Sequence, residues 1–359
     1  MTPALADYTT LGLGGPARSF VPAPTEADLI DAVRAADAAA DPLLLIGGGS
    51  NLVISDEGFP GTVIHVNTRG IGYADAPQPA DAPEVGQRAV DVTVAAGEDW
   101  DDVVAATVAE GLAGLESLSG IPGRAGATPI QNVGAYGREV AEVITQVRVY
   151  DREEDRILVI ANEACGFAYR TSLFKSTGAR YVVLDVTFRL ARQALSLPVK
   201  YAELAAELGV ALGEGADVGE VRSAVLKIRS RKGMVLSPGD PDTRSAGSFF
   251  TNPIITAADF AAVEAAAAAR AAGPVPKYDA GPGLVKVPAA WLIEHAGFAK
   301  GYGAPAPARV SSKHTLALVN TGNATTAELV TLAREIVSGV HSAYGVTLTP
   351  EPTLIGVTL

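Results

Sequence analysis

Apolar residues recur along the chain with two different periods, which together predict a mixture of helices and strands. Leu29, Ile30 and Val33 follow Thr25 at the spacing of a capped amphipathic helix, whereas apolar residues alternate with polar ones over 90–94, as in a half-buried strand. The same patterns predict further strands over 43–46, 63–66, 143–150, 156–160 and 181–190, and further helices over 100–113, 201–208, 217–231, 256–272 and 325–344.

The order of these elements indicates an α+β enzyme of several domains. Strands and helices alternate up to about Arg192, and helices prevail after it. The predicted strands 143–150 and 156–160 flank a charged turn, which favours a hairpin. A proline-rich loop at 77–83 predicts an insertion or a domain boundary. We find no internal repeat, and the mixture is not that of one doubly wound sheet.

Composition limits the classes of function. The 359 residues are 48% hydrophobic, enough for two or three domains with cores of their own. The formal net charge of −12 argues against binding to nucleic acid or to an anionic membrane, although a local cationic cluster could still bind an anionic substrate. With one cysteine and four scattered histidines, neither an intramolecular disulfide nor a metal centre is expected. The absence of a long apolar run or a signal-like N-terminus predicts a cytoplasmic protein.

A glycine triplet follows the predicted strand 43–46 directly. Successive glycines allow backbone N–H groups to turn toward one anion, and neighbouring hydroxyl and amide side chains add hydrogen bonds. This chemistry suits a diphosphate, although the segment is neither a G-x-G-x-x-G motif nor a P-loop. A glycine-rich hairpin turn is the simpler interpretation. The residues concerned are Gly47, Gly48, Gly49, Ser50 and Asn51.

A second segment, 120–137, has five glycines and two prolines in eighteen residues and few charges. It is a poor core element and an unusual solvated linker. The backbone polar groups of a long apolar loop must find partners, which a large planar ligand with polar edges would supply. An ordered structural loop without a ligand is the alternative.

Ser248 lies in a setting that could make its hydroxyl a proton donor to carbon. Gly247 precedes it, so a ligand could approach the backbone closely, and Phe249 and Phe250 follow and could keep water out. Asn252 precedes Pro253, which ends the local structure. The plainer reading of the same pattern is a turn that leads into a buried strand.

Three charged residues are further candidates. Arg170 follows an aromatic residue and could bind a carboxylate through two hydrogen bonds, or could form an ordinary surface ion pair. Glu351 lies between Pro350 and Pro352, which fix its backbone, although a simple turn explains the segment equally well. Lys232 follows the predicted helix 217–231 and could contact a phosphate, or could serve with its neighbours to complement the helix dipole.

Taken together and in order, these segments resemble the UDP-N-acetylenolpyruvoylglucosamine reductase (MurB) family, type I. Each segment alone is weakly specific, but the ordered set spans nearly the whole chain. The matching segments are 9–12, 47–52, 120–137, 169–175, 246–253, 290–293 and 350–352.

The resemblance implies an FAD-binding fold of the vanillyl-alcohol-oxidase type followed by a substrate domain. It also implies that the last residues return to the active site. The expected parts are an FAD-binding domain over 1–193 with subdomains of about 1–70 and 71–193, a helical connector over 194–232 that carries substrate contacts, a substrate-binding domain over 233–345, and a C-terminal segment over 346–359.

The resemblance further implies an enzyme of peptidoglycan synthesis, and hence a role in cell shape and division. NADPH would reduce a non-covalently bound FAD, and hydride from flavin N5 would then reduce the enolpyruvyl ether of UDP-GlcNAc to give UDP-N-acetylmuramate. Because NADPH and the enolpyruvyl ether would occupy the same face of the flavin in turn, the expected kinetics are ping-pong. The partners implied are the UDP-sugar and NADPH, and the protein is expected to be a monomer.

The resemblance also implies roles for individual residues. Ser248 would protonate the carbanion, Arg170 would stabilise the enolate, and Glu351 would assist. The expected flavin contacts are Gly47, Gly48, Gly49, Ser50, Asn51, Gly120, Ile121, Pro122, Gly123, Gly126, Ala127, Gln131, Asn132, Gly134, Ala135, Tyr136 and Gly137. The expected substrate contacts are Tyr169, Tyr201, Lys232 and Asn252. Whether Arg124 meets the flavin or solvent is left open by the sequence.

Two other functions compete with this one. A flavin-dependent sugar or alcohol oxidase of the same fold would need both glycine segments, and it would consume oxygen with a free alcohol. A catalytically silent module that binds FAD or a nucleotide sugar would bind its ligand without turnover. Neither alternative accounts for Ser248, Arg170 and Glu351 together.

Overall fold

The chain forms two compact units, each assembled from separated segments. A computed structural model describes residues 2–77 and 88–359. We call Ser19–Gly48 with Pro60–Ser230 the sheet unit, and Met1–Arg18, Gly49–Phe59 and Arg231–Leu359 the C-terminal unit. The glycine triplet is divided, since the chain leaves the sheet unit after Gly48. How far these units coincide with the expected functional domains remains a prediction.

A small sheet near the start of the chain has the order β1-β4-β2, with β2 parallel to β4. The Thr25 hydroxyl accepts a hydrogen bond from the Asp28 N–H at 3.1 Å and caps the expected helix. Leu29 and Val33 on that helix are fully buried, so the predicted apolar face is confirmed. The elements are β1 (Ala17–Ala23), α1 (Glu26–Ala38), β2 (Leu43–Ile46) and β4 (Phe59–Val66).

A six-stranded antiparallel sheet forms the larger part of the sheet unit. Its order is β11-β10-β12-β6-β5, and β7 pairs with the end of β12. The predicted hairpin is confirmed, since β10 and β11 pair from Gln146↔Ala161 to Asp151↔Arg156. The strands are β5 (Ile71–Asp75), β6 (Ala89–Ala95), β7 (Leu112–Ala113), β10 (Ile144–Asp151), β11 (Arg156–Ala161) and β12 (Tyr181–Arg192).

The predicted helix over 100–113 is wrong at its end, because α2 spans Trp100–Ala109. Gly111 has a φ of 67°, a left-handed conformation that ends a helix at little cost when the residue is glycine. Leu112 and Ala113 then pair with β12 as strand β7. Both residues are buried, and an apolar pattern alone does not distinguish this outcome from another helical turn.

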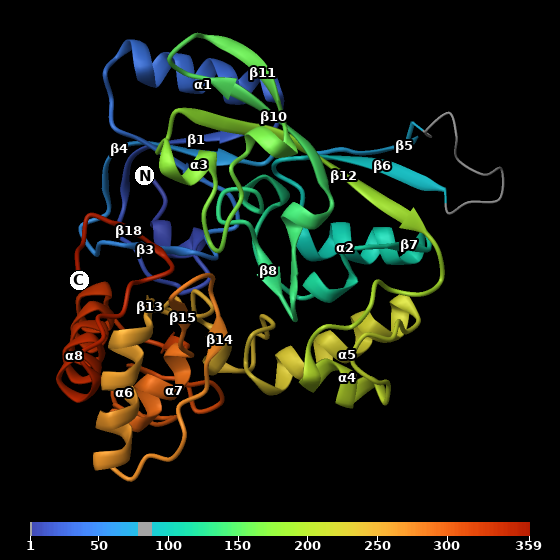
Figure 1. Ribbon diagram of the computed structural model, residues 1–359. Coiled ribbons are helices and arrows are strands. Elements are labelled where there is room, and N and C mark those ends of the chain that lie inside the picture. Colours follow the sequence, from blue (N-terminus) through green and yellow to red (C-terminus); the bar gives the residue numbers. More distant parts are fainter. Residues whose placement is uncertain (1, 78–87) are drawn as a thin grey trace. The chain divides into compact units, whose positions relative to one another are not determined.

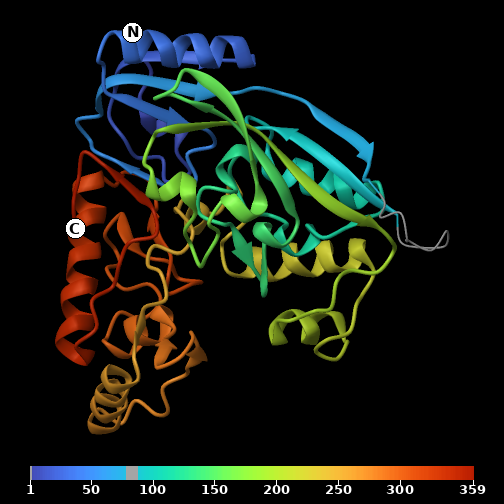
Figure 2. The ribbon, with the colours of Figure 1, turned by 45° about the horizontal axis from the view of Figure 1, so that its top comes forward.

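The main core of the sheet unit joins residues of the large sheet, α1, β4 and α2, and Trp100 of α2 packs in it against Phe188 with ring centroids 5.6 Å apart. On the outer side, α1 runs beside the β10–β11 hairpin (Figures 1 and 2), and Arg148 binds Glu26 at 2.6 Å. The predicted helices near 201–208 and 217–231 are confirmed and share a small separate core. The remaining elements of the unit are β8 (Gly134–Ala135), β9 (Arg138–Glu139), α3 (Leu173–Ser176), α4 (Ala202–Leu208) and α5 (Val218–Arg231).

The C-terminal unit packs α6 and α7 against α8 (Figure 1). Three small sheets accompany them, in the orders β13-β15-β14, β16-β17 and β18-β3. The elements are β3 (Leu52–Ile54), β13 (Ile254–Thr256), α6 (Ala257–Ala269), β14 (Tyr278–Asp279), β15 (Leu284–Lys286), α7 (Ala289–His295), β16 (Ala308–Val310), β17 (Leu318–Asn320), α8 (Thr326–Tyr344) and β18 (Thr353–Ile355).

The amphipathic helix predicted over 325–344 is confirmed as α8. Thr325 forms a reciprocal capping box with Glu328, and Leu329, Ile336 and Val340 are fully buried. The alanine-rich helix α6 is shorter than the predicted 256–272. It starts after the Thr256 cap and ends at Ala269.

Short 3₁₀ helices complete the fold, at Leu5–Tyr8, Glu116–Leu118, Ala125–Ala127, Val140–Glu142, Asn162–Ala164 and Pro241–Thr243. Of the proline-rich loop expected at 77–83, all but Pro77 lies outside the described residues. Within the ranges described, no helix is both long and apolar enough to cross a membrane.

Candidate active site

In the sheet unit, the start of the first glycine segment lies directly against the second. A methyl group built on Gly48 would stand 2.8 Å from the Gly123 Cα, and one built on Gly47 would stand 2.9 Å from the Arg124 Cγ. Real Cβ contacts are longer than this, so only glycine fits at these positions without displacing the neighbouring chain. Two segments more than seventy residues apart therefore form one close-packed backbone surface.

The start of the second segment is anchored to α2. The Gly120 N–H donates to Asp101 Oδ1 at 2.6 Å, and the Trp100 N–H donates to the Gly123 oxygen at 3.1 Å. Arg222 of α5 binds both oxygens of Asp101, at 2.6 and 2.9 Å. Burial alone would raise the pKa of Asp101, but the hydrogen bonds from Arg222 and Gly120 outweigh it and hold the pKa low. Sequence reasoning missed this pair, because no local pattern relates residues so far apart.

The far end of the second segment is held by the turn that carries Arg170. Arg170 donates from Nη2 to the Gly134 oxygen at 3.1 Å, and the Ser172 hydroxyl donates to the Ile130 oxygen at 2.7 Å. Asn132 donates from its amide to Ala168 O at 3.2 Å and to Glu139 Oε2 at 2.7 Å. Asn132 therefore orders the loop itself, and its role toward the flavin stays a prediction.

Tyr136 and Gly137 form the tip of the β8–β9 hairpin, with φ values of 51° and 77°. Two left-handed residues in succession give a turn whose twist suits the flanking strands. The Tyr136 ring meets the Tyr201 ring edge to face, with centroids 5.4 Å apart. Burial raises the pKa of Tyr136 to about 12, although the nearby Arg229 charge opposes the shift. A predicted flavin contact and a predicted substrate contact thus touch each other.

Tyr169 and Arg170 occupy a tight turn closed by backbone hydrogen bonds between Ala168 and Thr171, at 3.1 and 3.2 Å. Arg170 has a φ of 54°, which is uncommon for a residue other than glycine. Its guanidinium lies 5.8 Å from the centre of the Tyr169 ring, and the Lys175 ammonium donates to the Arg170 oxygen at 3.0 Å. Such a constrained backbone is often found at functional sites, where the surrounding structure holds it in place.

The other predicted flavin contacts of the sheet unit line the same loop. The Gly126 N–H donates to the Ala96 oxygen at 2.9 Å, and a methyl group on Gly126 would collide with Ala96. Gln131 is buried, Ala127 is exposed, and Ile121, Pro122 and Ala135 are half-buried.

In the C-terminal unit, the rest of the first glycine segment lies beside the end of the chain. A methyl group on Gly49 would stand 1.9 Å from the Tyr8 oxygen, and φ at Gly49 is 56°. Ser50 is half-buried. The backbone oxygen of Asn51 accepts a hydrogen bond from the Thr353 N–H at 2.9 Å, and the side-chain amide of Asn51 donates to the backbone oxygen of Glu351 at 3.4 Å. Parallel pairing of β3 with β18 continues this contact.

Ser248 and Glu351 lie on neighbouring stretches of backbone in this unit. The Glu351 N–H donates to the Phe249 oxygen at 2.9 Å, and Phe250 and Pro350 form an isolated antiparallel β-bridge. Both phenylalanine rings are buried, at 0% and 1% exposed, so they belong to the core. Ser248 is half-buried, and its hydroxyl forms no hydrogen bond with any residue that the structure describes.

The two predicted substrate contacts of the C-terminal unit differ in their surroundings. The Asn252 Oδ1 accepts from the Ala289 N–H at 2.9 Å, at the first residue of α7, so this side chain caps a helix. Lys232 is half-buried and directly follows α5, as the sequence predicts, and Gly233 comes next with a φ of 66°.

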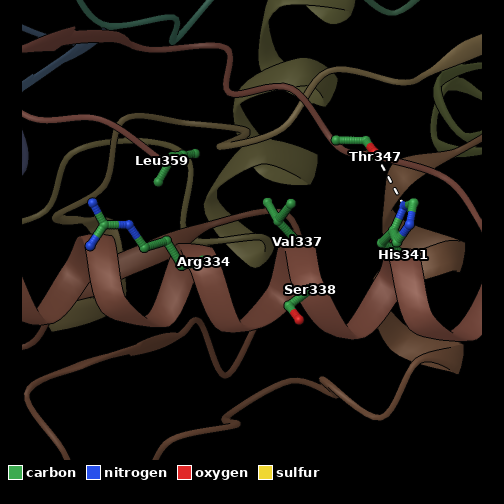
Figure 3. A pocket seen from close by; sticks show the side chains of 6 residues that line it. All are labelled: Arg334, Val337, Ser338, His341, Thr347 and Leu359. Carbon is green, nitrogen blue, oxygen red and sulfur yellow. Dashed lines mark hydrogen bonds between the residues drawn. The ribbon is translucent and has the colours of Figure 1, made fainter.

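A cavity of about 280 Å³ lies along α8 in the C-terminal unit (Figure 3). There the Thr347 hydroxyl and His341 Nδ1 lie 3.2 Å apart, and Arg334 donates to the Thr358 oxygen at 2.7 Å. The lining residues are Arg334, Val337, Ser338, His341, Thr347 and Leu359. None of them is a predicted site residue.

Comparison with known proteins decides the family. A protein from Thermobifida fusca named UDP-N-acetylenolpyruvoylglucosamine reductase is 55% identical over 99% of this chain and 97% of its own length. The chain belongs to the UDP-N-acetylenolpyruvoylglucosamine reductase family. A reductase of the same name from Streptomyces coelicolor is 53% identical over 99% of this chain and 90% of its own length.

Family models and a solved structure agree with this membership. The FAD binding domain family matches residues 17–160, and the C-terminal domain of the UDP-N-acetylenolpyruvoylglucosamine reductases matches 240–355. The crystal structure of the Thermus caldophilus reductase superposes with a TM-score of 0.62 at 25% identity, covering 98% of this chain and 97% of that one. The predicted α+β architecture with an FAD-binding domain is confirmed.

The reductase family defines the activity. This chain is an FAD-dependent oxidoreductase that reduces the enolpyruvyl group of its UDP-sugar substrate and gives UDP-N-acetylmuramate for peptidoglycan synthesis. The residues present suit the cofactor. Gly48 leaves no room for a side chain beside Gly123, and Gly47 leaves none beside the Arg124 side chain. Successive glycines of this kind allow backbone N–H groups to bind an anion closely.

Proposed function

We propose that Ser248 is the proton donor of the reaction. When bound, FAD supplies the hydride that reduces the terminal carbon of the enolpyruvyl double bond. The adjacent carbon then takes a proton, which the Ser248 hydroxyl donates. The single observation that carries this proposal is that the hydroxyl has no hydrogen-bond partner among the described residues. The hydroxyl is therefore available to a substrate.

Two further side chains would act on the charge that develops beside that carbon. Arg170 would bind the substrate carboxylate and stabilise its enolate form, since a planar guanidinium matches a carboxylate. Its strained turn and its bond to Gly134 would fix the direction of the guanidinium. Glu351 would assist Ser248. The hydrogen bond from the Glu351 N–H to the Phe249 oxygen holds Glu351 next to the residue that follows Ser248.

The remaining assignments form part of the same proposal. NADPH is the electron donor. Backbone groups of the two glycine segments hold FAD, and Tyr169, Tyr201, Lys232 and Asn252 contact the UDP-sugar. The enzyme acts as a monomer in the cytoplasm, where NADPH and UDP-sugars are available. The expected domain boundaries divide the flavin-binding part from the substrate-binding part.

Substitution of Ser248 separates the two half-reactions. In anaerobic stopped-flow experiments on the holoprotein, Ser248→Ala should bleach normally with NADPH. Recolouring on addition of the UDP-linked enolpyruvyl ether should slow by about 10²-fold to 10⁴-fold, the usual contribution of a positioned proton donor. Ser248→Cys keeps a transferable proton and should recolour faster than the alanine variant.

A neighbouring serine provides the control. The Ser245 hydroxyl accepts a hydrogen bond from the Gly247 N–H at 3.2 Å and shapes the same turn. Ser245→Ala should therefore test the turn without removing the proton donor, and it should recolour at nearly the wild-type rate. Wild-type recolouring by Ser248→Ala would exclude the proposed role. Equal slowing by both alanine variants would assign the effect to the shape of the turn.

A further inference from the structure

The Arg124 guanidinium has a place and an environment that the protein alone does not account for. It extends from the second glycine segment, with its Cγ against Gly47 of the first. Its Nε is buried and lacks a hydrogen-bond partner among the described residues. An unsatisfied buried N–H of a charged group is costly, and it indicates a missing acceptor.

Among the residues that the structure describes, Arg124 forms one ion pair, and that pair is too weak to explain this position. Its Nη1 lies 3.5 Å from Asp99 Oδ2, at the limit for a hydrogen bond, and 44% of the Asp99 side chain is exposed. The Arg124 side chain itself is only 19% exposed. A single long contact with a solvated carboxylate contributes little, and it leaves the Nε unsatisfied.

Arg124 and a second arginine, Arg69, lie near a histidine beside the first glycine segment. His65 lies in β4, in register with Ile46, the residue before the glycine triplet. Burial lowers the pKa of His65, and the positive charges of Arg124 and Arg69 lower it further. Arg69 pairs with Glu98 at 3.3 Å and Arg124 with Asp99 at 3.5 Å, and of the two arginines it is Arg124 whose buried Nε lacks an acceptor among the described residues.

We propose that Arg124 binds the diphosphate of FAD, donating from Nε and the adjacent Nη to phosphate oxygens at the first glycine segment. This inference rests on the proposed flavin-binding role of the two glycine segments. It adds a charged side chain to a site that backbone groups otherwise form. A fork of two N–H donors matches two phosphate oxygens, as a lysine would not.

The experiment measures flavin binding and not turnover. Serial dilution of full-length holoprotein, followed by flavin fluorescence, gives the dissociation constant for FAD. Arg124→Leu should raise that constant by about 10-fold to 100-fold, as expected for the loss of charge-assisted hydrogen bonds. Arg124→Lys keeps the positive charge but not the fork of N–H donors, so its dissociation constant for FAD should lie between those of wild type and Arg124→Leu.

Riboflavin, which has no phosphate, distinguishes a diphosphate contact from a structural one. Titrated into the full-length chain freed of flavin, it should bind wild type and Arg124→Leu equally. Arg69→Leu is the matched control. Arg69 also lies near His65, but it pairs with Glu98 at 3.3 Å and is 47% exposed, so its loss should change FAD binding less than twofold.

The outcomes are distinct. FAD binding by Arg124→Leu within twofold of wild type, or an equal loss of riboflavin binding, would overturn the inference. Should the leucine variant fail to fold, the same criteria apply to Arg124→Lys. If wild type itself binds FAD no more tightly than riboflavin, it is the proposed flavin-binding role of the glycine segments that fails.

Discussion

Replacing Gly48 by alanine tests whether the two glycine segments meet as described. The added methyl group would stand 2.8 Å from the Gly123 Cα and 3.2 Å from its carbonyl carbon. Carbon atoms in contact prefer separations of about 3.5–4.0 Å, so the backbone segments around Gly48 and Gly123 must separate by roughly 0.7 Å or more. Backbone atoms cannot rotate aside as the end of a flexible side chain can.

The magnitude follows from that overlap. Inserting a methyl group into close-packed backbone costs about 1–3 kcal/mol, and Gly48 has no positive φ that would add strain. For a unit of this size each kcal/mol corresponds to about 2–4 °C, so the melting temperature should fall by roughly 2–12 °C. Because the flavin loops are also pushed apart, the dissociation constant for FAD should rise.

Gly72→Ala is the matched control. Gly72 lies in β5, and the nearest atom to its added methyl group would be the Thr93 oxygen at 4.0 Å. Thermal unfolding at saturating FAD, followed by circular dichroism, should show a lower melting temperature for Gly48→Ala alone. Flavin fluorescence should likewise show greater release of FAD from Gly48→Ala than from Gly72→Ala. Equal melting temperatures and equal FAD release in the two variants would refute the close approach of the segments.

Two further predictions concern ionisable groups. Because hydrogen bonds from Arg222 and Gly120 hold the folded pKa of Asp101 low, the carboxylate stabilises the fold above its ordinary pKa of about 3.9, and this stability is lost as pH falls. Asp101→Asn should therefore lower the unfolding free energy in urea by about 1–3 kcal/mol at neutral pH, with a smaller deficit at about pH 3; a constant deficit would contradict the assignment. Burial raises the pKa of the Cys165 thiol from its ordinary value of 9.0 to about 11, so its thiolate should be roughly 100-fold scarcer at pH 8 than that of an ordinary thiol. Ellman's reagent should thus label Cys165 only after unfolding, and rapid labelling of the native protein would be inconsistent with its burial.

The sequence predicts well those elements whose signals are local. The Thr25 and Thr325 caps and the apolar face of α8 are read directly from neighbouring residues, and the structure confirms them. The end of α2 was missed because Leu112 and Ala113 are apolar in either conformation. Only pairing with β12, which is distant in the chain, makes them a strand.

The site shows the same distinction. Its glycine segments are visible as composition, but the contact of Gly48 with Gly123 is not, because it depends on the tertiary fold. Asn132 and Asn252 show a further limit, since their amides order a loop and cap α7 within the protein. Sequence alone does not tell whether a polar side chain serves the fold or a ligand. The parallel pairing of β3 with β18, which brings Asn51 to Glu351, was likewise not predictable from local pattern.

Anaerobic absorbance of the purified wild-type holoprotein tests the central claim most directly. The account predicts that NADPH bleaches the flavin band and that the UDP-linked enolpyruvyl ether then restores it, with one UDP-N-acetylmuramate formed for each flavin reoxidised. A flavin that stays bleached after the ether is added, and recovers only when oxygen is admitted, would contradict the account and favour an oxidase.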